Sequence, residues 1–420
     1  MTSFARIPIA PAMRRLLLAT LVLSLLATFA AAETVHRRGF VPPADYDEIL
    51  AERMVRVPLD KDPLPPNFDW RDEGGTTPAR NQGDCGSCWA FAAVGEMEAK
   101  VKIYYGESLN LSEQQIVSCN PYGAGCNGGW AGAAYYVFMH HGGILENCMP
   151  YDGSDNVACR QNEFLKFSDM DTWVSIPNDI DQIKTELYNN GPVCTSVDAN
   201  EAWDGYSGGV IDVPGQGTNH LVLIVGWDDR MGDDGVWIVK NSWGPGWGEG
   251  GFGYVAYGSC NIGSGVTSLS YTPPAVSVGV STPEGGGVYD GDDSVTITWV
   301  TANEVVDAVD LYYGTAGACQ DIPIAENVPN TGSYEWTLPN VSTERASVVV
   351  FPSEGTQRGF GFPDGEFTIV GHQTRYVSAA GANVPPYDTP ATAAHLLNDA
   401  VLAGAGRDTI MVAGGDYLES

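Results

Sequence analysis

Two adjacent prolines, Pro273 and Pro274, divide the chain into parts of different sequence character. Tandem prolines neither continue a helix nor donate to a β-ladder, so they favour a boundary between folded units. Residues 65–272 are rich in glycine, tryptophan and cysteine, whereas apolar and polar residues alternate after the prolines. A chain of 420 residues also exceeds one ordinary domain. We therefore predict two or three domains.

The part that follows the prolines is predicted to be a β-sandwich over residues 273–371. Alternation with a period of two, between turn-rich stretches such as residues 329–332, indicates half-buried antiparallel strands. On this pattern the region resembles the immunoglobulin- or fibronectin-like modules appended to secreted enzymes. The alternating residues are Val295, Ile297, Trp299, Val309, Leu311, Tyr313, Tyr334, Trp336, Leu338, Phe367 and Ile369.

The last segment, residues 372–420, is predicted to begin a right-handed parallel β-helix. It has an extended start, a proline-rich turn, a helical segment over residues 391–402 and then the sequence Asp-Thr-Ile-Met-Val-Ala-Gly-Gly over residues 408–415. A β-helix cap without following coils cannot bury its apolar face, so we expect the sequence to be truncated here. We expect the C-terminal β domains to contact a cell surface or a polysaccharide.

The N-terminal region carries the pattern of an export signal. Arg14 and Arg15 precede an apolar run over residues 16–30, and small alanines follow up to residue 32. The run is shorter than the roughly 20 residues that span a bilayer. We predict a signal peptide over residues 1–32, a secreted protein and no membrane insertion after signal removal. Residues 33–63 lack a sustained helical period and are interpreted as a short pro-segment or linker.

The charge of the chain argues against nucleic acid as a partner. Lys and Arg number 21 against 52 Asp and Glu, which gives a formal net charge of -31. A charge of this sign repels polyphosphates and anionic lipid surfaces.

Nine cysteines occur in a chain predicted to enter an oxidising compartment. An odd number leaves at least one thiol without a partner in the chain. Such a thiol in an exported protein is either reactive or a liability, and the position of each cysteine decides which.

Cys88 is the candidate nucleophile. It begins a segment through Lys102 that is rich in Ala, Met, Glu and Lys, which predicts a helix with Ser87 near its cap. A thiol at a helix N-terminus feels the positive end of the helix dipole, which favours the thiolate. Gln82 lies six residues earlier, and its side-chain amide is a candidate donor to an oxyanion beside the Cys88 backbone amide.

A thiolate nucleophile also requires a base and a residue that orients it. His220 begins the apolar sequence His-Leu-Val-Leu-Ile-Val-Gly-Trp, which predicts a strand whose edge faces a cleft. Asn241 begins Asn-Ser-Trp-Gly, and its amide oxygen can accept a hydrogen bond from the second ring nitrogen of the imidazole. His140 and His141 precede two glycines and are interpreted as a solvated helix end, where a cation offsets the dipole.

These motifs, taken together, resemble the papain and cathepsin family of cysteine peptidases over residues 64–272. The resemblance is carried by the sequence around Cys88, by the spacings to His220 and Asn241, and by further runs in the same order. The further runs are Leu64–Arg71, Leu111–Gln115, Cys126–Gly129, Asn219–His220 and Asn241–Gly248.

The resemblance implies an α+β fold of two lobes, one helical and one β-rich, followed by the all-β sandwich. It implies an endopeptidase that acts on proteins or peptides through a thioester, with no cofactor and no metal. By position, Gln82 is the oxyanion donor, Cys88 the nucleophile, His220 the acid and base, and Asn241 the orienting residue. Gly128 and Gly129 would pair with an extended substrate, and Trp243 would shield the His and Asn pair. The implied disulfides are Cys85–Cys126 and Cys119–Cys159, with Cys148, Cys194, Cys260 and Cys319 left open.

Three other interpretations fit parts of the sequence. Cys85 and Cys88 have the CxxC spacing of redox and zinc sites, but there is no second such pair. A peptidase fold that has lost activity and serves as an extracellular binding or adhesion protein is the main alternative function. A third possibility keeps the triad but transfers the acyl group to an amine.

Overall fold

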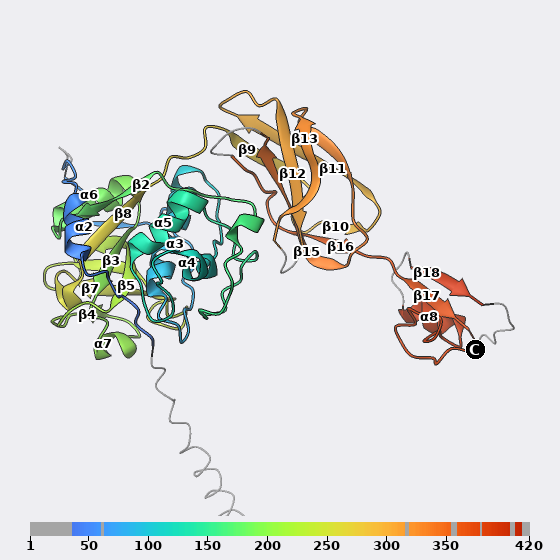
Figure 1. Ribbon diagram of the computed structural model, residues 1–420, viewed down its shortest axis with the longest axis horizontal. Helices are drawn as coiled ribbons and strands as arrows, with labels where there is room; N and C mark the ends of the chain where they lie inside the picture. The colour runs from blue at the N-terminus through green and yellow to red at the C-terminus, as the bar shows by residue number, and fades with distance from the viewer. Residues whose placement is uncertain are drawn as a thin grey trace, which may run out of the picture.

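The structure is a computed structural model that describes residues 36–59, 63–315, 319–353, 359–378, 380–403 and 408–413. The predicted signal peptide over residues 1–32 lies outside these ranges. Figure 1 shows a body of mixed helices and strands, then a group of strands, then a small C-terminal unit.

The helical lobe is built around α3 (Cys88–Tyr104), whose residues from Cys88 to Val101 are all buried. A helix that is covered on every side is mostly small or apolar around its circumference, as the alanines of α3 are. Its buried charged residues Glu96, Glu98 and Lys100 require polar partners. It packs against α5 on one side and strand β5 on the other. The other helices of this part are α2 (Tyr46–Glu52), α4 (Glu113–Cys119), α5 (Ala131–His141), α6 (Ile180–Asn190) and α7 (Glu201–Asp204), with short 3-10 turns at Gln161–Glu163 and Ser259–Asn261.

The β-rich lobe contains, among the described residues, an eight-stranded sheet in the order β2-β8-β3-β5-β6-β7-β4, with β1 paired to β5. Its central strand β5 (His220–Asp228) is buried from His220 to Trp227. Leu221 and Leu223 pack with the helical core, whereas Val222 and Ile224 pack with a cluster of tryptophans. The other strands are β1 (Asn67–Asp69), β2 (Thr172–Ile176), β3 (Val193–Val197), β4 (Val210–Ile211), β6 (Val236–Lys240), β7 (Phe252–Ala256) and β8 (Ser264–Ser270).

Residues 277–370 form two further sheets that share one apolar core. One has the order β10-β16-β15-β12-β13 and the other β14-β11-β9. Their pairs are antiparallel as expected, except that β10 and β16 run parallel. The strands are β9 (Ser277–Thr282), β10 (Val288–Asp290), β11 (Ser294–Ala302), β12 (Ala308–Gly314), β13 (Ile322–Pro329), β14 (Ser333–Thr337), β15 (Thr343–Pro352) and β16 (Phe367–Val370).

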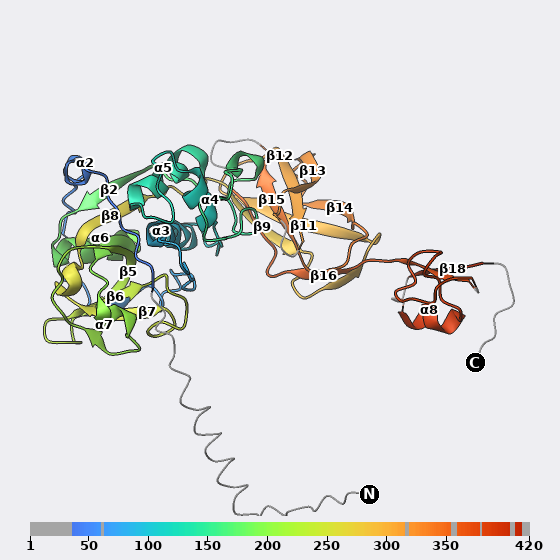
Figure 2. The ribbon, with the colours of Figure 1, turned by 60° about the horizontal axis from the view of Figure 1, so that its bottom comes forward.

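Strands β12 and β15 and the chain around Phe360 pack directly on the helical lobe (Figure 2). Phe167 contacts Phe351 and Phe360, with ring centroids 5.4 Å apart in both cases. The Tyr105 hydroxyl donates to the Phe360 carbonyl at 2.7 Å and accepts from the Phe360 amide at 2.8 Å. A disulfide joins Cys148 of the helical lobe to Cys319. The two parts therefore share an apolar core and a covalent link.

The C-terminal unit is small and partly parallel, with β17 (Thr374–Val377) beside β18 (Thr409–Val412). Helix α8 spans Leu397–Ala403, so it begins later than the predicted helical segment over residues 391–402. The reason is a parallel bridge between Ala394 and Val377, which holds the first part of that segment in an extended conformation.

Residues 36–59 differ from the sequence interpretation of residues 33–63 because they contain the helix α2. Tyr46, Ile49 and Leu50 of this seven-residue helix pack against the helical core. Seven residues span only about two turns, which is too short for a sustained helical period to be recognised.

Phe167→Ala should destabilise the contact between the helical lobe and the following strands. Truncating a buried phenylalanine costs about 3–5 kcal/mol, and Phe167 is 3% exposed. In urea denaturation we expect one cooperative transition to separate into two. Val305→Ala is the control, because Val305 is 95% exposed. An unchanged single transition in Phe167→Ala would contradict the shared core.

Candidate active site

Cys88 is the first residue of α3 and carries a free, fully buried thiol. Ser87 occupies the N-cap position, but its side chain makes no capping hydrogen bond with a described residue. Cys85 is bonded to Cys126, so the two cysteines of the CxxC sequence do not form a dithiol pair.

His220 and Asn241 are brought together by the neighbouring strands β5 and β6. His220 is the first residue of β5, and Asn241 follows the last residue of β6. The His220 Nε2 and Asn241 Oδ1 atoms lie 2.8 Å apart. The Leu221 amide donates to the Cys88 sulfur at 3.4 Å, so the start of β5 lies against the start of α3. The Trp243 ring lies 4.8 Å from the His220 ring, between centroids.

Gln82 is held by both its backbone and its side chain. Its backbone amide donates to the Ser242 carbonyl at 2.8 Å, and its side-chain Oε1 accepts from the Ser242 hydroxyl at 2.6 Å. Its Nε2 donates to the Cys85 carbonyl and to the Arg37 carbonyl, both at 2.9 Å. The side-chain amide of Gln82 therefore already binds a peptide carbonyl from another part of the chain.

The Arg37 carbonyl belongs to an N-terminal segment, residues 36–41, that runs between the two lobes. Gly129 donates to the Gly39 carbonyl at 2.9 Å and accepts from the Val41 amide at 2.8 Å. The Phe40 amide donates to the Asn219 carbonyl on the opposite lobe at 2.9 Å. Phe40 and Gly129 form a parallel bridge. An extended peptide thus occupies the space beside Cys88.

Side chains at the start of this segment bind the β-rich lobe. The His36 ring stacks on Trp243, with centroids 4.4 Å apart and an interplanar angle of 4°. Arg38 pairs with Asp204 at 2.6 Å and donates to the Ala199 carbonyl.

Gly39 must be a glycine for the segment to lie so close to the loop before α3. A β-carbon at this position would lie 1.9 Å from the Gly86 carbonyl oxygen. Gly128 has a φ of +121°, a conformation that L side chains rarely adopt.

Burial sets the protonation states of the two central groups. It raises the pKa of Cys88 to about 11, although the backbone amides of Leu221 and Gly39 act in the opposite direction. It lowers the pKa of His220 to about 4, against the effect of the Asn241 hydrogen bond. Both groups are therefore neutral at pH 7 while the segment covers them. The helix dipole that favours the thiolate is outweighed in this form.

All nine cysteines lie in described parts of the chain. Besides Cys85–Cys126, the structure joins Cys119 to Cys159 and Cys148 to Cys319. Cys88, Cys194 and Cys260 are free and buried. The pairs that the sequence left open are thereby reduced to one bond and two thiols.

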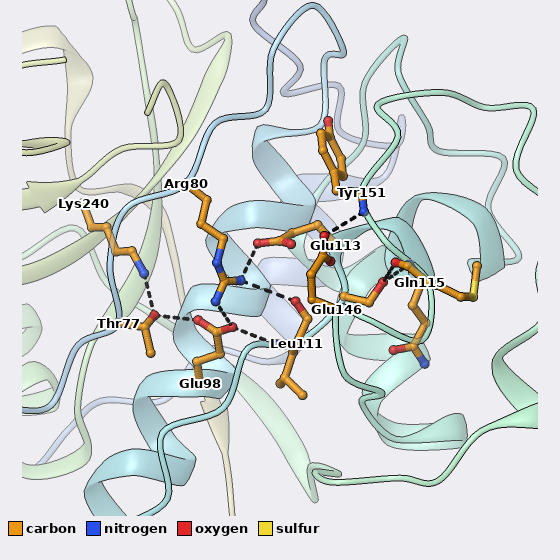
Figure 3. A network of polar contacts seen from close by, with 11 residues as sticks. Thr77, Arg80, Glu98, Leu111, Glu113, Gln115, Glu146, Tyr151 and Lys240 are labelled. Atoms are coloured by element: carbon orange, nitrogen blue, oxygen red, sulfur yellow. Dashed lines mark hydrogen bonds and ion pairs between the residues drawn. The ribbon is translucent and has the colours of Figure 1, made fainter. Parts of the chain in front are cut away.

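A buried charge network supports the loops that carry Gln82 and Asn241 (Figure 3). Lys240 donates to the Thr77 hydroxyl at 2.8 Å, which donates to Glu98 at 2.5 Å. Arg80 forms ion pairs with Glu98 at 2.7 Å and Glu113 at 2.8 Å. Lys240 and Arg80 stand one and two residues before Asn241 and Gln82, respectively. The sequence contained Glu113 within a recognised run but gave no sign of its partners, which lie far away in the chain.

Two further expectations concern residues away from Cys88. His140 and His141 end α5, and the His140 ring stacks on Tyr136.

Among the described residues, no group of three or more His, Cys, Asp or Glu side chains is arranged to hold a metal ion. No helix of the described ranges has the length and apolar character to cross a membrane.

The model of the papain family of cysteine proteases matches residues 64–270. Zingipain-2 of Zingiber officinale is 37% identical over 194 residues, which are 46% of this chain and 87% of that protein. The probable cysteine protease RD19B of Arabidopsis thaliana is 34% identical over 229 residues, 50% of this chain and 63% of that protein. The chain thus spans less than two thirds of that relative's length.

A solved structure, the digestive procathepsin L2 proteinase from Tenebrio molitor larval midgut, has a TM-score of 0.51 and 26% identity to this chain. The match covers 63% of this chain and 95% of that one. Fold and sequence together define the class as a cysteine protease of two lobes. The chain belongs to the papain family of cysteine proteases, and the predicted α+β papain-like fold is confirmed.

Acidification should destabilise the form in which the segment covers His220. The unfolded chain binds a proton near pH 6.5, whereas the folded imidazole binds one only near pH 4, so stability rises with pH across this window. The loss between pH 6.5 and 4 should approach about 3 kcal/mol from this group. We would measure urea unfolding of the Cys88→Ala protein at pH 7 and 4.5, with and without His220→Gln. Equal losses on acidification in both proteins would contradict the assignment.

Gly39→Ala should displace the N-terminal segment and expose the thiol. The added methyl group would clash with the Gly86 carbonyl, and an overpacked contact costs roughly 1–3 kcal/mol, which corresponds to about five- to 150-fold in the open population. Alkylation of Cys88 by iodoacetamide should accelerate accordingly. Gly246→Ala is the matched control, because a β-carbon there meets nothing within 4 Å. The account fails if both variants react at the rate of the unmodified chain.

Proposed function

We propose that this protein is a secreted cysteine endopeptidase that hydrolyses peptide bonds through Cys88, His220 and Asn241. One observation carries the proposal. An extended peptide of the chain itself lies beside Cys88, with the Arg37 carbonyl on the Gln82 amide and the Gly39 carbonyl on the Gly129 amide. The same space and the same donors suit a peptide substrate, a form of strand addition.

The reaction begins once residues 36–41 have left the site. Water then reaches Cys88 and His220, which reverses the burial that keeps both groups neutral. The proton of the thiol passes to the imidazole, and the Cys88 thiolate attacks the scissile carbonyl carbon. His220 gives this proton to the leaving amine, and a thioester remains. Water assisted by His220 then hydrolyses the thioester and releases the acid product.

Asn241 orients the base of this proton transfer, and Gln82 stabilises the charge that forms on the substrate. Asn241 Oδ1 accepts from His220 Nε2, so Nδ1 is the nitrogen left for the proton of the thiol. Gln82 Nε2 and the Cys88 backbone amide donate to the oxyanion that forms on the attacked carbonyl. Trp243, packed on the imidazole, would shield the hydrogen bond between His220 and Asn241 from the water that reaches Cys88.

The domain organisation follows from the same proposal. Residues 1–32 would direct export, residues 33–63 would act as a short pro-segment, and residues 64–272 would be the peptidase domain. Residues 273–371 would form the sandwich and residues 372–420 the β-helix-like unit. Contact with a cell surface or polysaccharide through these C-terminal domains remains part of the proposal.

Cys88→Ala and His220→Ala should each lower peptide hydrolysis by about four orders of magnitude or more, because members of a triad act as a unit. Asn241→Ala should cost less, roughly 10²- to 10⁴-fold, since it orients the base. Activity would be measured on a fluorogenic peptide with protein from which the N-terminal segment has been removed. Cys260→Ala is the control, a free buried cysteine whose sulfur bonds Asn200, Ser259 and Val213 and none of the three triad residues. Retained hydrolysis in Cys88→Ala would refute the nucleophile.

An epoxide inhibitor separates this function from the adhesion alternative. The processed protein should form a covalent adduct at Cys88, detected by peptide mass spectrometry. A fully folded protein that takes no label and cleaves no peptide would favour a decayed peptidase. Analysis of products with and without an added amine would identify acyl transfer in place of hydrolysis.

A further inference from the structure

We propose that Tyr151 positions the oxyanion donor Gln82 against Cys88, and that the Cys148–Cys319 disulfide anchors the Tyr151 loop to the sandwich. The inference rests on the proposed function, because it concerns the same site. The sandwich holds no residue of the triad, but through Cys319 it would affect how Gln82 is positioned.

The Tyr151 hydroxyl lies between the two ends of the loop that leads into α3. It donates to the Gln82 carbonyl at 2.9 Å and lies 2.5 Å from the Ser87 hydroxyl. A phenol has one proton to donate, so Ser87 must be the donor in the second bond. The result is a chain of hydrogen bonds from Ser87 through Tyr151 to Gln82.

These hydrogen bonds hold Gln82 and Ser87, the residue directly before the nucleophile Cys88. Ser87 directly precedes Cys88 and uses its hydroxyl for Tyr151, with no capping bond to a described residue of α3. The backbone of Gln82 is held by Ser242 on one side and by Tyr151 on the other. Without the phenol, the loop between Gln82 and Ser87 loses its link across its ends.

The ring of Tyr151 is held as firmly as its hydroxyl. It packs edge-on against Phe91 of α3, with centroids 4.9 Å apart. Its own amide donates to Glu146 Oε1 at 2.7 Å (Figure 3). Burial raises the pKa of Tyr151 to about 12, so the hydroxyl keeps its proton at neutral pH.

The loop that carries Tyr151 is tied to the sandwich three residues earlier. Cys148 is bonded to Cys319, and the neighbouring Asn147 donates to Gln320 at 3.2 Å. Between the disulfide and Tyr151, the Met149 carbonyl accepts from the Ser112 hydroxyl at 2.6 Å. The stretch that leads to Tyr151 is therefore held by the sandwich through the disulfide and by the start of α4 through Ser112.

Tyr151→Phe keeps the ring and removes only the hydroxyl. With the processed full-length protein we expect kcat for an amide substrate to fall roughly three- to tenfold, the range for one neutral hydrogen bond, with KM nearly unchanged. Alkylation of Cys88 by iodoacetamide requires the thiolate but no oxyanion donor, so it should fall less than kcat. Equal falls in both rates, or an unchanged kcat, would overturn the assignment to Gln82.

Tyr104→Phe is the matched control. It removes a tyrosine hydroxyl that donates to the Asn189 carbonyl at 3.2 Å, at the opposite end of the helix that begins with Cys88. Its kcat should equal that of the unmodified chain. A fall of the same size as in Tyr151→Phe would reduce the effect to a general loss of helix stability and overturn the proposal.

A double-mutant cycle tests the anchor. The Cys148→Ala and Cys319→Ala pair should lower kcat, and adding Tyr151→Phe should lower it little further, because both changes act on one interaction. Additive losses, or no loss from the cysteine pair, would contradict an anchor that works through Tyr151. If the cysteine pair does not fold, Gln320→Ala in place of the pair gives the same comparison.

Failure of this inference is distinct from failure of the proposed function. Epoxide labelling of Cys88 and hydrolysis by the unmodified chain test the function. Tyr151→Phe tests only how Gln82 is held, so a fully active variant would leave the peptidase assignment in place.

Discussion

The packing of α3 against β5 is the contact on which the rest of the structure depends. Successive side chains of a strand point to opposite faces, so Leu221 and Leu223 meet the helix while Val222 and Ile224 meet the tryptophan cluster. A slip of one residue would exchange these two sets, which fixes the register. The register sets His220 at the boundary of the lobes and the Leu221 amide on the Cys88 sulfur.

The N-terminal segment, residues 36–41, fills the space beside Cys88 and also keeps water away from Cys88 and His220. By covering Cys88 and His220 it removes the water that would stabilise a thiolate and an imidazolium, so the proton stays on sulfur. Its anchors are short-range and specific: a glycine against Gly86, a backbone ladder with Gly129 and a ring on Trp243. In the proposed function, these few contacts are what keeps the site unreactive until the segment leaves.

The α+β papain-like fold was predictable because the motifs around Cys88, His220 and Asn241 resemble the papain family, whereas local signals predicted single elements. Alanine-rich residues after Ser87 specify a buried helix, and the apolar run after His220 specifies a central strand. The roles of Gln82, Cys88, His220 and Asn241 stay predictions, now with a geometry that can be tested. What the sequence could not provide depends on distant partners. Examples are the Cys148–Cys319 bond, the charge network around Arg80 and the parallel pairing of β10 with β16.

The central claim is that Cys88 becomes a thiolate next to His220 when the segment leaves. The most direct measurement is the titration of the Cys88 thiolate, followed by its ultraviolet absorbance, before and after removal of residues 36–41. The account predicts that the thiol of the covered form titrates only near pH 11 and that the uncovered form holds a thiolate at neutral pH. The same high pKa in both forms would contradict it.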